Sequence, residues 1–302
     1  GGGYYILNVT IGSPPTLYRL LFDTGSSNLG ISGAGCTTCG DATKYDVSAS
    51  STGNDVLCSS TACQTCNLDG GADCLFGKPY CALADPSACG TGISYGGGSS
   101  YLSGHLASDQ VTIQGMNVTS TFLVADNMYP DASFADGIIG FAHEYNSCNP
   151  TCIPTIFSQL VSTYGLAPMF GLCLNITAGG VLDLGFTDTS KYTGALQWMP
   201  VTVDHWYNLP LSDIQVGTAS IGLPFFTYRA NNDQIGTFID SGTGIVLLGP
   251  QAFAQLQGVF QTKYCSVPGV CTPSQGTIFD GMCYSAEEAA KYIPMLPPVV
   301  RG

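Results

Sequence analysis

Basic residues are scarce in this chain of 302 residues, in which 8 lysines and arginines face 21 aspartates and glutamates. The resulting negative field repels nucleic acid and anionic membrane surfaces, so we expect neither as a partner. A run of about twenty apolar residues, which a membrane-spanning helix needs, is also missing. The 3 histidines are scattered, without a metal-ligand cluster and without the setting of a serine or cysteine protease. We therefore expect no membrane span, no metal and no cofactor.

Cysteine, by contrast, is abundant. Fourteen cysteines are many for a reducing compartment, and their even number suits disulfides. Three glycosylation sequences, at Asn8, Asn117 and Asn175, indicate the same secretory route. The chain begins at Gly1 without a signal peptide, so we interpret it as a processed form, as of a zymogen. We expect a secreted protein or one in an acidic vacuolar or lysosomal lumen.

Eight cysteines lie between Cys36 and Cys89, in a segment that is predicted to be a stapled, loop-like insertion. A zinc site is the alternative for its two Cys-x-x-Cys pairs, but the pairs are far apart and no histidine lies near. The pairing stays open, except that Cys148 with Cys152 and Cys265 with Cys271 are expected local bridges. The candidate disulfide cysteines are Cys36, Cys39, Cys58, Cys63, Cys66, Cys74, Cys81, Cys89, Cys148, Cys152, Cys265 and Cys271.

Short apolar runs separated by glycine, proline, serine and asparagine predict an all-β protein. The chain length favours two domains, which we place at residues 1–167 and 168–302. The expected strands are 4–11, 17–22, 110–114, 122–125, 181–184, 196–203, 209–216 and 237–239. The few expected helices are 154–164, 250–264 and 285–293.

One short pattern occurs once in each half of the chain. Asp23-Thr24-Gly25 ends an apolar run, and Asp240-Ser241-Gly242 does the same 217 positions later (240 − 23). A single Asp-x-Gly is a common turn signal. Two copies, each after an apolar strand and each followed by serine or threonine, predict two carboxylates that related lobes bring to one place.

Paired carboxylates suit hydrolysis, because one can take a proton from water while the other, protonated, polarises the scissile carbonyl. Two like charges held close together cannot both ionise cheaply, so their pKa values separate and supply both roles. Gly25 and Gly242 let the backbone approach the carboxylates closely. By their places in the motifs, Thr24 and Ser241 are expected to brace the turns, and Ser26 and Thr243 to hydrogen-bond the aspartates.

At these residues the chain resembles the pepsin-like aspartic proteases. The runs at 22–29 and 239–243 look like that family's two active-site motifs, and 136–140 is similar to its segment that threads beneath the first aspartate. The resemblance implies two related β-rich lobes with an active-site cleft between them. It also implies an acid endopeptidase that uses an Asp23/Asp240 dyad, takes peptide or protein substrates and binds pepstatin-type inhibitors. The cysteine-rich insertion looks like the nepenthesin-like branch.

The run at 93–100 resembles the flap of the same family, a hairpin that closes over substrate. Tyr95 is the expected flap residue, and Gly96 and Gly97 allow the tip to bend. A phosphate-binding loop is the alternative for such glycines, but no helix pattern or lysine follows. A hairpin tyrosine without a role in substrate binding is the other alternative.

The sequence departs from the family in two places. Gly30 stands where many members carry a tryptophan that partners the flap tyrosine. Only 62 residues (302 − 240) follow Asp240, and a second apolar-apolar-Gly segment is not found. We hypothesise that a separate C-terminal chain of the same precursor completes the second lobe, linked through Cys173 and Cys283. The competing interpretations are a catalytically silent binding protein or inhibitor with this fold, and an inactive zymogen or truncated decoy.

Overall fold

The computed structural model describes residues 4–64, 81–82, 84–129, 135–148, 152–175, 179–203, 205–229, 236–271, 277–281 and 283–296. The chain groups into two compact units. Unit 1 consists of Gly1–Trp198, Val203–Tyr207 and Phe238–Gly244. Unit 2 consists of Met199–Thr202, Asn208–Thr237 and Ile245–Gly302. Both aspartates of the predicted dyad therefore belong to unit 1, and the expected lobe boundary at residue 167 stays a prediction.

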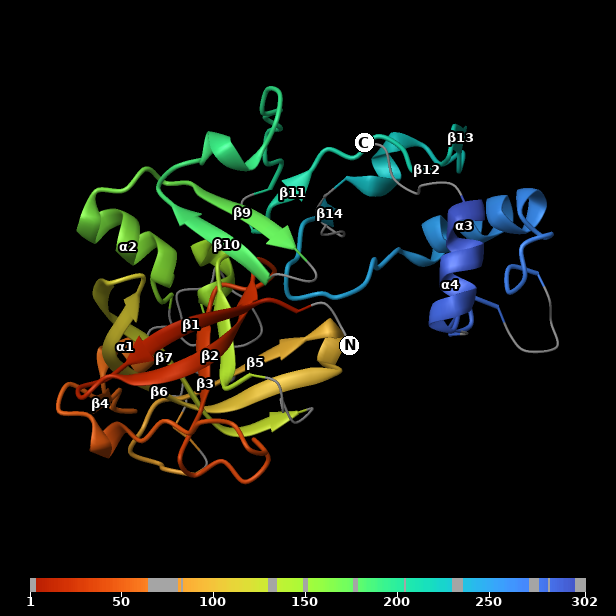
Figure 1. Cartoon of the computed structure of the whole chain (residues 1–302). Coiled ribbons are helices and arrows are strands. Elements are labelled where there is room, and N and C mark those ends of the chain that lie inside the picture. The colour runs from red at the N-terminus through yellow and green to blue at the C-terminus, as the bar shows by residue number, and fades with distance from the viewer. Residues whose placement is uncertain are drawn as a thin grey trace. The chain divides into compact units, whose positions relative to one another are not determined.

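Unit 1 is built on an eight-stranded sheet whose first strands are drawn in red in Figure 1. Its strands are β1 (Ile6–Ile11), β2 (Thr16–Asp23), β3 (Leu29–Ser32), β4 (Asn54–Asp55), β5 (Gly90–Tyr95), β6 (Ser100–Ile113), β7 (Met116–Tyr129) and β8 (Gly137–Gly140). The strand order is β1-β2-β8-β3-β7-β6-β4, with β5 on β6. Because β1 also pairs with β6, the strands from β1 to β6 form a closed ring. This pairing covers the edge of β1 that β2 leaves open.

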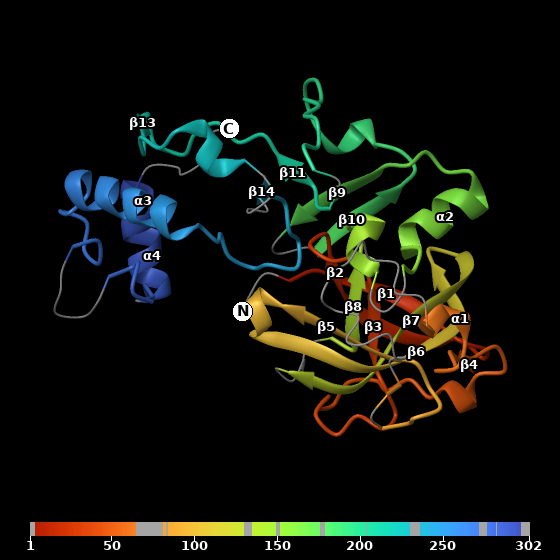
Figure 2. The same ribbon diagram turned by 180° about the vertical axis from the view of Figure 1, so that it is seen from behind.

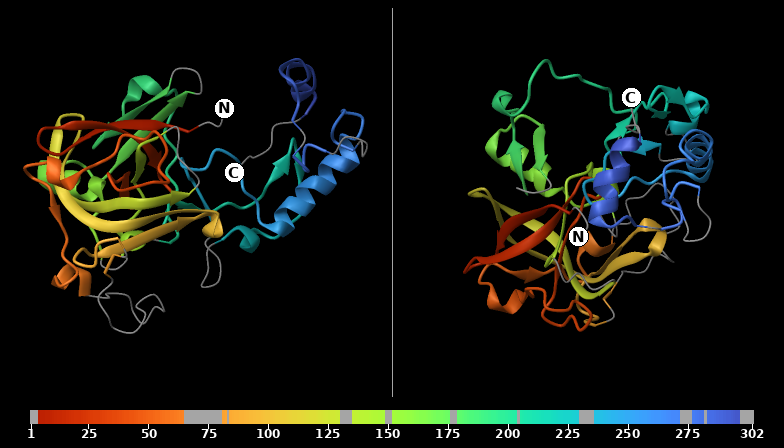
Figure 3. Two further views of the ribbon diagram at one scale, coloured as in Figure 1. Left: turned by 90° about the horizontal axis from the view of Figure 1, so that it is seen from below. Right: turned by 45° about the vertical axis from the view of Figure 1, so that its right-hand side comes forward.

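The longest hairpin, β6 with β7, is the curved yellow ribbon in Figure 3. Each strand has 14 residues, whereas the sequence predicted only 110–114 and 122–125. The two residues of the turn, Gln114 (φ 51°) and Gly115 (φ 82°), both take positive φ, as a tight hairpin turn requires. The strand predictions were too short because the apolar alternation is interrupted on the buried face, where Asp109 of β6 and Ser120 of β7 are polar but almost fully buried.

The segment that was expected to thread beneath Asp23 does so as β8. It runs parallel to β2, with Gly140 opposite Asp23, and antiparallel to β3. Figure 2 shows these three strands together from behind. The glycines at its ends have no room for a side chain, since a Cβ on Gly140 would lie 2.5 Å from the Ser27 nitrogen. The close fit of β8 buries the end of β2.

One helix and a two-stranded sheet complete the core of unit 1. Helix α2 (Ile156–Tyr164) begins at a Thr155 cap and ends at Gly165 in the left-handed conformation, close to its predicted limits. The small sheet pairs β9 (Phe170–Asn175) with β10 (Gly179–Leu184). The core shared by these elements contains a cluster of aromatic rings, formed by Phe22, Phe141, Phe157 and Phe170.

Disulfides staple the cysteine-rich segment, which includes the short helix α1 (Thr61–Gln64) and β4 and so is not loop-like throughout. The bonded pairs in the described residues are Cys36–Cys39, Cys58–Cys81, Cys63–Cys89, Cys148–Cys152 and Cys265–Cys271. Both predicted local bridges are therefore present. Cys66 and Cys74 lie outside the described residues. The described part of the chain contains no group of three or more potential metal ligands.

Unit 2 has its own small apolar core, centred on Ile214, Leu256 and Phe260. Its helices α3 (Pro250–Lys263) and α4 (Ala286–Tyr292) follow the predicted limits, and a Ser285/Glu288 capping box begins α4. Its strands are short: β11 (Asn208–Leu209), β12 (Gln215–Val216) and β13 (Ala219–Ser220). Strand β14 (Thr237–Phe238) has its first residue in unit 2 and its second in unit 1.

The expected class, mostly β with few short helices, is confirmed. Two strand predictions were wrong. Described residues in 196–203 form no strand, and only the two ends of 209–216 do. The apolar side chains of the first run, among them Trp198 and Met199, are exposed, so their sequence pattern marks no buried strand face. In the described residues, no helix is long and apolar enough to cross a membrane.

Candidate active site

The two Asp-x-Gly motifs form matching turns in unit 1. Asp23 is the last residue of β2, and Asp240 follows β14 by two residues. In each turn the backbone N–H two residues on, of Gly25 or Gly242, donates to the aspartate Oδ1 at 2.8 Å. This is the local geometry of an Asx turn, which aspartate forms with its own backbone.

A hydroxyl group three residues on donates to the second oxygen of each carboxylate. Ser26 Oγ donates to Asp23 Oδ2, and Thr243 Oγ1 donates to Asp240 Oδ2 at 2.6 Å. Each carboxylate thus receives one backbone and one hydroxyl donor, and the hydroxyl donors are the two expected from the motif positions. Hydrogen bonds of this kind stabilise the ionised form of a carboxyl group.

Thr24 and Ser241 join the two turns reciprocally. Thr24 Oγ1 donates to the Ile239 carbonyl at 3.0 Å and accepts from Ser241 N–H at 3.0 Å. Ser241 Oγ in turn donates to the Phe22 carbonyl at 2.8 Å and accepts from Thr24 N–H at 3.0 Å. These four hydrogen bonds link positions 215 to 219 residues apart, and they hold both carboxyl groups in one place.

The glycine of each turn faces the opposite carboxyl group. A Cβ on Gly25 would lie 2.6 Å from the carboxyl carbon of Asp240, and one on Gly242 would lie 2.7 Å from that of Asp23. Real Cβ atoms do not approach other atoms so closely, so both positions require glycine. The two carboxyl groups are therefore close neighbours, and each faces the backbone of the opposite turn.

Asp23 and Asp240 differ in burial. Asp23 is 3% exposed, whereas Asp240 is half-buried. Burial, and then a hydrogen bond and the charge of Asp240, raise the pKa of Asp23 to about 7, while the Ser26 hydroxyl and the Gly25 N–H act in the opposite sense. The surroundings of Asp23 therefore disfavour its charged form.

The predicted flap residues lie at the tip of the β5–β6 hairpin. Tyr95 ends β5, and Gly96 (φ 55°) begins the single 3-10 turn Gly96–Gly98 that leads to β6. Among the described residues, the Tyr95 hydroxyl oxygen is buried and has no hydrogen-bond partner of normal geometry, although the Ser26 hydroxyl lies near enough to lower the Tyr95 pKa. Burial, and then the charge of Asp23, raise the pKa of Tyr95. The flap tyrosine thus lies beside the first aspartate, and its role toward substrate stays a prediction.

Leu102 lies over Gly30, the position at which many proteins of the resembled family carry a tryptophan. It extends from β6 and is 7% exposed, and a Cβ on Gly30 would lie 3.1 Å from its Cδ2 atom. Tyr95 packs against the same apolar cluster, which also contains Ile138 of β8. Apolar packing on Gly30 therefore fastens the flap strand to the base of the site.

Sequence reasoning missed the segment 205–207. Trp206 Nε1 donates to the Gly25 carbonyl at 2.8 Å, and Tyr207 Oη donates to the Phe141 carbonyl at 2.6 Å. Only the run of three aromatic side chains, His205-Trp206-Tyr207, could have drawn attention to it. The His205 ring stacks on Tyr145 with ring centroids 3.7 Å apart.

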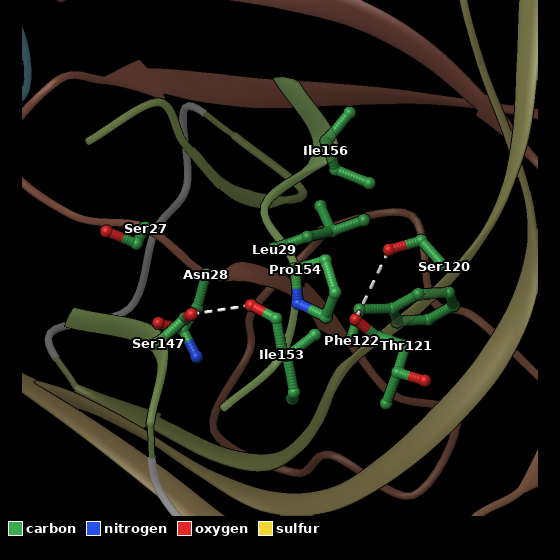
Figure 4. Close-up of a pocket in the computed structure, with 10 residues that line it drawn as sticks. All are labelled: Ser27, Asn28, Leu29, Ser120, Thr121, Phe122, Ser147, Ile153, Pro154 and Ile156. Atoms are coloured by element: carbon green, nitrogen blue, oxygen red, sulfur yellow. Dashed lines mark hydrogen bonds between the residues drawn. The ribbon is translucent and has the colours of Figure 1, made fainter. Parts of the chain in front are cut away.

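A small pocket lies behind the first motif, between Ser27, Asn28 and Leu29 on one side and β7 on the other (Figure 4). Its lining includes neither Asp23 nor Asp240. Ser27 instead fastens the turn, since its hydroxyl donates to the His143 carbonyl at 2.5 Å. The pocket is therefore part of the packing that supports the turn.

The three glycosylation asparagines are exposed, and Cys173 and Cys283 are free and exposed. Asn8 and Asn117 lie on β1 and β7, and Asn175 ends β9. Glycosylation itself stays a prediction.

Comparison with known proteins agrees with this geometry. A sequence model of the family described as eukaryotic aspartyl protease matches residues 4–63 and 60–274. The chain belongs to the eukaryotic aspartyl protease family. The predicted resemblance to pepsin-like enzymes is thereby confirmed, and the family is one of hydrolases.

Individual relatives from the aspartyl protease family are similar over most of this chain. Cathepsin E of Aquarana catesbeiana is 30% identical over 300 residues, which cover 93% of this chain and 64% of the relative. Cathepsin D of Dictyostelium discoideum is 29% identical over 257 residues (81% and 56%). Gastricsin of Rattus norvegicus is 26% identical over 268 residues (83% and 56%). The chain thus spans between 56% and 64% of the length of these relatives.

Proposed function

We propose that this protein is an acid endopeptidase that hydrolyses peptide bonds with water activated by Asp23 and Asp240. The observation that carries the proposal is the matched pair of turns, in which two carboxyl groups lie at one site. Each carboxyl group accepts hydrogen bonds from the same two kinds of donor, one backbone N–H and one hydroxyl group. Membership of the aspartyl protease family supports the same chemistry.

The unequal burial of Asp23 and Asp240 supports a different catalytic role for each. Asp23 carries the proton and hydrogen-bonds the scissile carbonyl oxygen, because burial disfavours its charge. Asp240 accepts a proton from water, and the hydroxide equivalent adds to the carbonyl carbon. The carbonyl oxygen takes the Asp23 proton as the tetrahedral intermediate forms. The intermediate collapses when Asp240 gives the proton that it took from water to the amide nitrogen, the C–N bond breaks, and a hydroxyl proton returns to Asp23. The Thr24/Ser241 hydrogen bonds keep both carboxyl groups in place through these steps.

Substrates of the proposed enzyme are extended peptides or unfolded proteins, and its inhibitors are of the pepstatin type. We place it outside the cell or in an acidic lumen, since five disulfides in the described residues fit an oxidising environment. The excess of acidic residues fits the same setting, because protonation in acid removes most of the net negative charge.

The test is cleavage of a denatured protein between pH 3 and 7, with and without a pepstatin-type inhibitor, by the unmodified protein, Asp23→Asn and Asp240→Asn. We expect cleavage in acid that the inhibitor stops, and a loss of roughly 1000-fold or more in either variant. Asp188→Asn, at a half-buried position in a separate turn, is the control. Full activity of either dyad variant, or cleavage that ignores the inhibitor, would contradict the dyad. Binding of the inhibitor without cleavage would instead indicate a silent binding protein.

We also propose that Cys173 and Cys283 form disulfides with a separate C-terminal chain of the same precursor. The support is that both thiols are exposed and unbonded in a chain whose other described cysteines are all paired. Mass spectrometry of the native protein should show a second chain that dissociates on reduction. A double variant, Cys173→Ser with Cys283→Ser, should retain less of this second chain. An active native preparation that contains only this chain would exclude the idea.

A further inference from the structure

The segment 205–207 contacts both catalytic turns. The indole N–H of Trp206 donates to the Gly25 carbonyl at 2.8 Å. The same ring stacks on Phe238, which lies two residues before Asp240, with centroids 5.5 Å apart and planes inclined by 27°. On the backbone, Ile239 N–H donates to the Tyr207 carbonyl at 3.3 Å. One short segment therefore touches the turn of each aspartate.

Its neighbours hold Trp206 in place on both sides. The His205 carbonyl accepts from Asn146 Nδ2 at 2.6 Å. Tyr207 Oη donates to the Phe141 carbonyl at 2.6 Å, and Phe141 N–H donates to the Asp23 carbonyl at 2.7 Å. The indole is thus presented to Gly25 from a backbone that is fixed to the loop after β8.

Gly25 is the residue in the first turn that most needs such a hold. It must be glycine, because a Cβ would collide with the Asp240 carboxyl group. Glycine, however, has the widest choice of backbone angles. The peptide unit that begins at the Gly25 carbonyl carries Ser26, and the Ser26 hydroxyl donates to Asp23 Oδ2. The orientation of the Gly25 carbonyl therefore decides where the Ser26 hydroxyl points.

We infer that Trp206 is a positioning residue, whose indole N–H holds the Gly25 carbonyl and so keeps the Ser26 hydroxyl directed at Asp23. This inference rests on the proposed function, because the group that it positions belongs to the proposed dyad. Trp206 touches neither carboxylate through any contact in the structure, and acts through the Gly25–Ser26 peptide.

Loss of the Trp206 hydrogen bond should change the pKa of Asp23 in one direction. The Ser26 hydrogen bond lowers the pKa of Asp23, against burial and against Asp240, so weakening it lets that pKa rise further. The other titratable group that interacts with Asp23 is Tyr95. Loss of the indole N–H should therefore move the alkaline limb of the activity profile to higher pH. A loss of folded protein alone would lower activity without moving that limb.

The experiment compares Trp206→Phe, which keeps an aromatic ring against Phe238 and removes the donor, with Trp198→Phe. Trp198, the other tryptophan of the chain, is 75% exposed and serves as the matched control. We expect Trp206→Phe to lower kcat roughly 3- to 10-fold, as for one hydrogen bond, with KM little changed and the alkaline limb at higher pH. Trp198→Phe should leave kcat, KM and the pH of the alkaline limb unchanged. If Trp206→Phe has the same kcat and the same alkaline limb as Trp198→Phe, the inference is wrong.

Two further measurements cover the remaining outcomes. If Trp206→Phe does not fold, benzothienylalanine at position 206 in the Trp198→Phe protein replaces only the N–H by sulfur, and the same shift is expected. If the unmodified protein cleaves no peptide, the proposed function fails, and the inference is judged by the ¹³C titration of the Asp23 carboxyl, assigned with Asp23→Asn. A titration moved to higher pH by the change at 206 supports it, and coincident curves overturn it.

Discussion

Asp23 and Asp240 have the same local hydrogen bonds but different surroundings. The strand after the first turn, β3, is buried along its whole length, with Ile31 0% exposed. The residues after the second turn, Ile245, Val246 and Leu247, are each more than 70% exposed. The first run pairs with β7 and β8, while the second lies in no strand. The comparison teaches that an Asp-x-Gly turn builds its own donor set, whereas burial of the carboxyl group depends on strands from elsewhere in the chain.

The largest expected difference is in stability. Ile31→Ala leaves a cavity in the core of unit 1 and should lower the free energy of unfolding by about 2–5 kcal/mol. Ile245→Ala removes an exposed side chain and should change it by less than about 0.5 kcal/mol. Urea unfolding of both variants measures the difference. Equal losses of unfolding free energy in the two variants would show that residues 245–247 are buried in solution. The two turns would then not differ in the burial of the residues that follow them.

The next difference concerns pH. The pKa of Asp23 is raised in the folded protein, to about 7 from 3.8, so the folded state binds more protons than the unfolded state between these values. The stabilisation is complete below pH 4 and is lost as the pH rises through 7, on the order of 4 kcal/mol in all. Unfolding at fixed pH values should show this decline.

Two variants separate the sources of that decline. Asp23→Asn should flatten it. Asp240→Asn should leave most of it, because burial is the largest cause of the raised pKa of Asp23 and the Asp240 carboxyl is a smaller one. Equal slopes in the two variants would contradict the ranking of burial above charge.

The two glycines should differ in a smaller, kinetic measurement. A Cβ at position 242 would press on Asp23, which is buried and cannot move away, whereas one at 25 would press on the half-buried Asp240. Both Gly→Ala variants should lose peptidase activity, roughly 100-fold as for a displacement of about 1 Å, with Gly242→Ala the more severe. Gly35→Ala is the control, since a Cβ there has no neighbour within 4 Å. A milder effect at 242 than at 25 would reverse the comparison.

The smallest expected effect lies in the hydroxyl donors. Ser26 is 7% exposed, so Ser26→Ala leaves an oxygen of Asp23 without a donor in a buried place. Water can replace the donor that Thr243→Val removes from half-buried Asp240. We expect kcat to fall roughly 5-fold in the first variant and about 2-fold in the second. Steady-state kinetics at one acidic pH measures both changes in kcat. A larger fall in kcat for Thr243→Val than for Ser26→Ala would contradict the unequal burial of Asp23 and Asp240.

Elements with local signals were predicted well. Helices α2 and α3 begin and end near the predicted residues, because their Thr155 cap, Gly165 and Pro250 act within one or two turns. The strand predicted at 196–203 failed because an apolar run says nothing about whether a partner strand is available. Likewise, Trp206 had no recognisable spacing to either motif, since its contacts reach 181 residues back to Gly25.

By itself, the sequence determined the two turns, their donors and the family to which the chain belongs. Those features depend on residues within three positions of each aspartate. Only the tertiary structure decided that Asp23 is more buried than Asp240, that Leu102 lies over Gly30, and that Trp206 holds the Gly25 carbonyl. The physical reason is that burial and long-range hydrogen bonds depend on which segments meet, and that is settled by packing of the whole core.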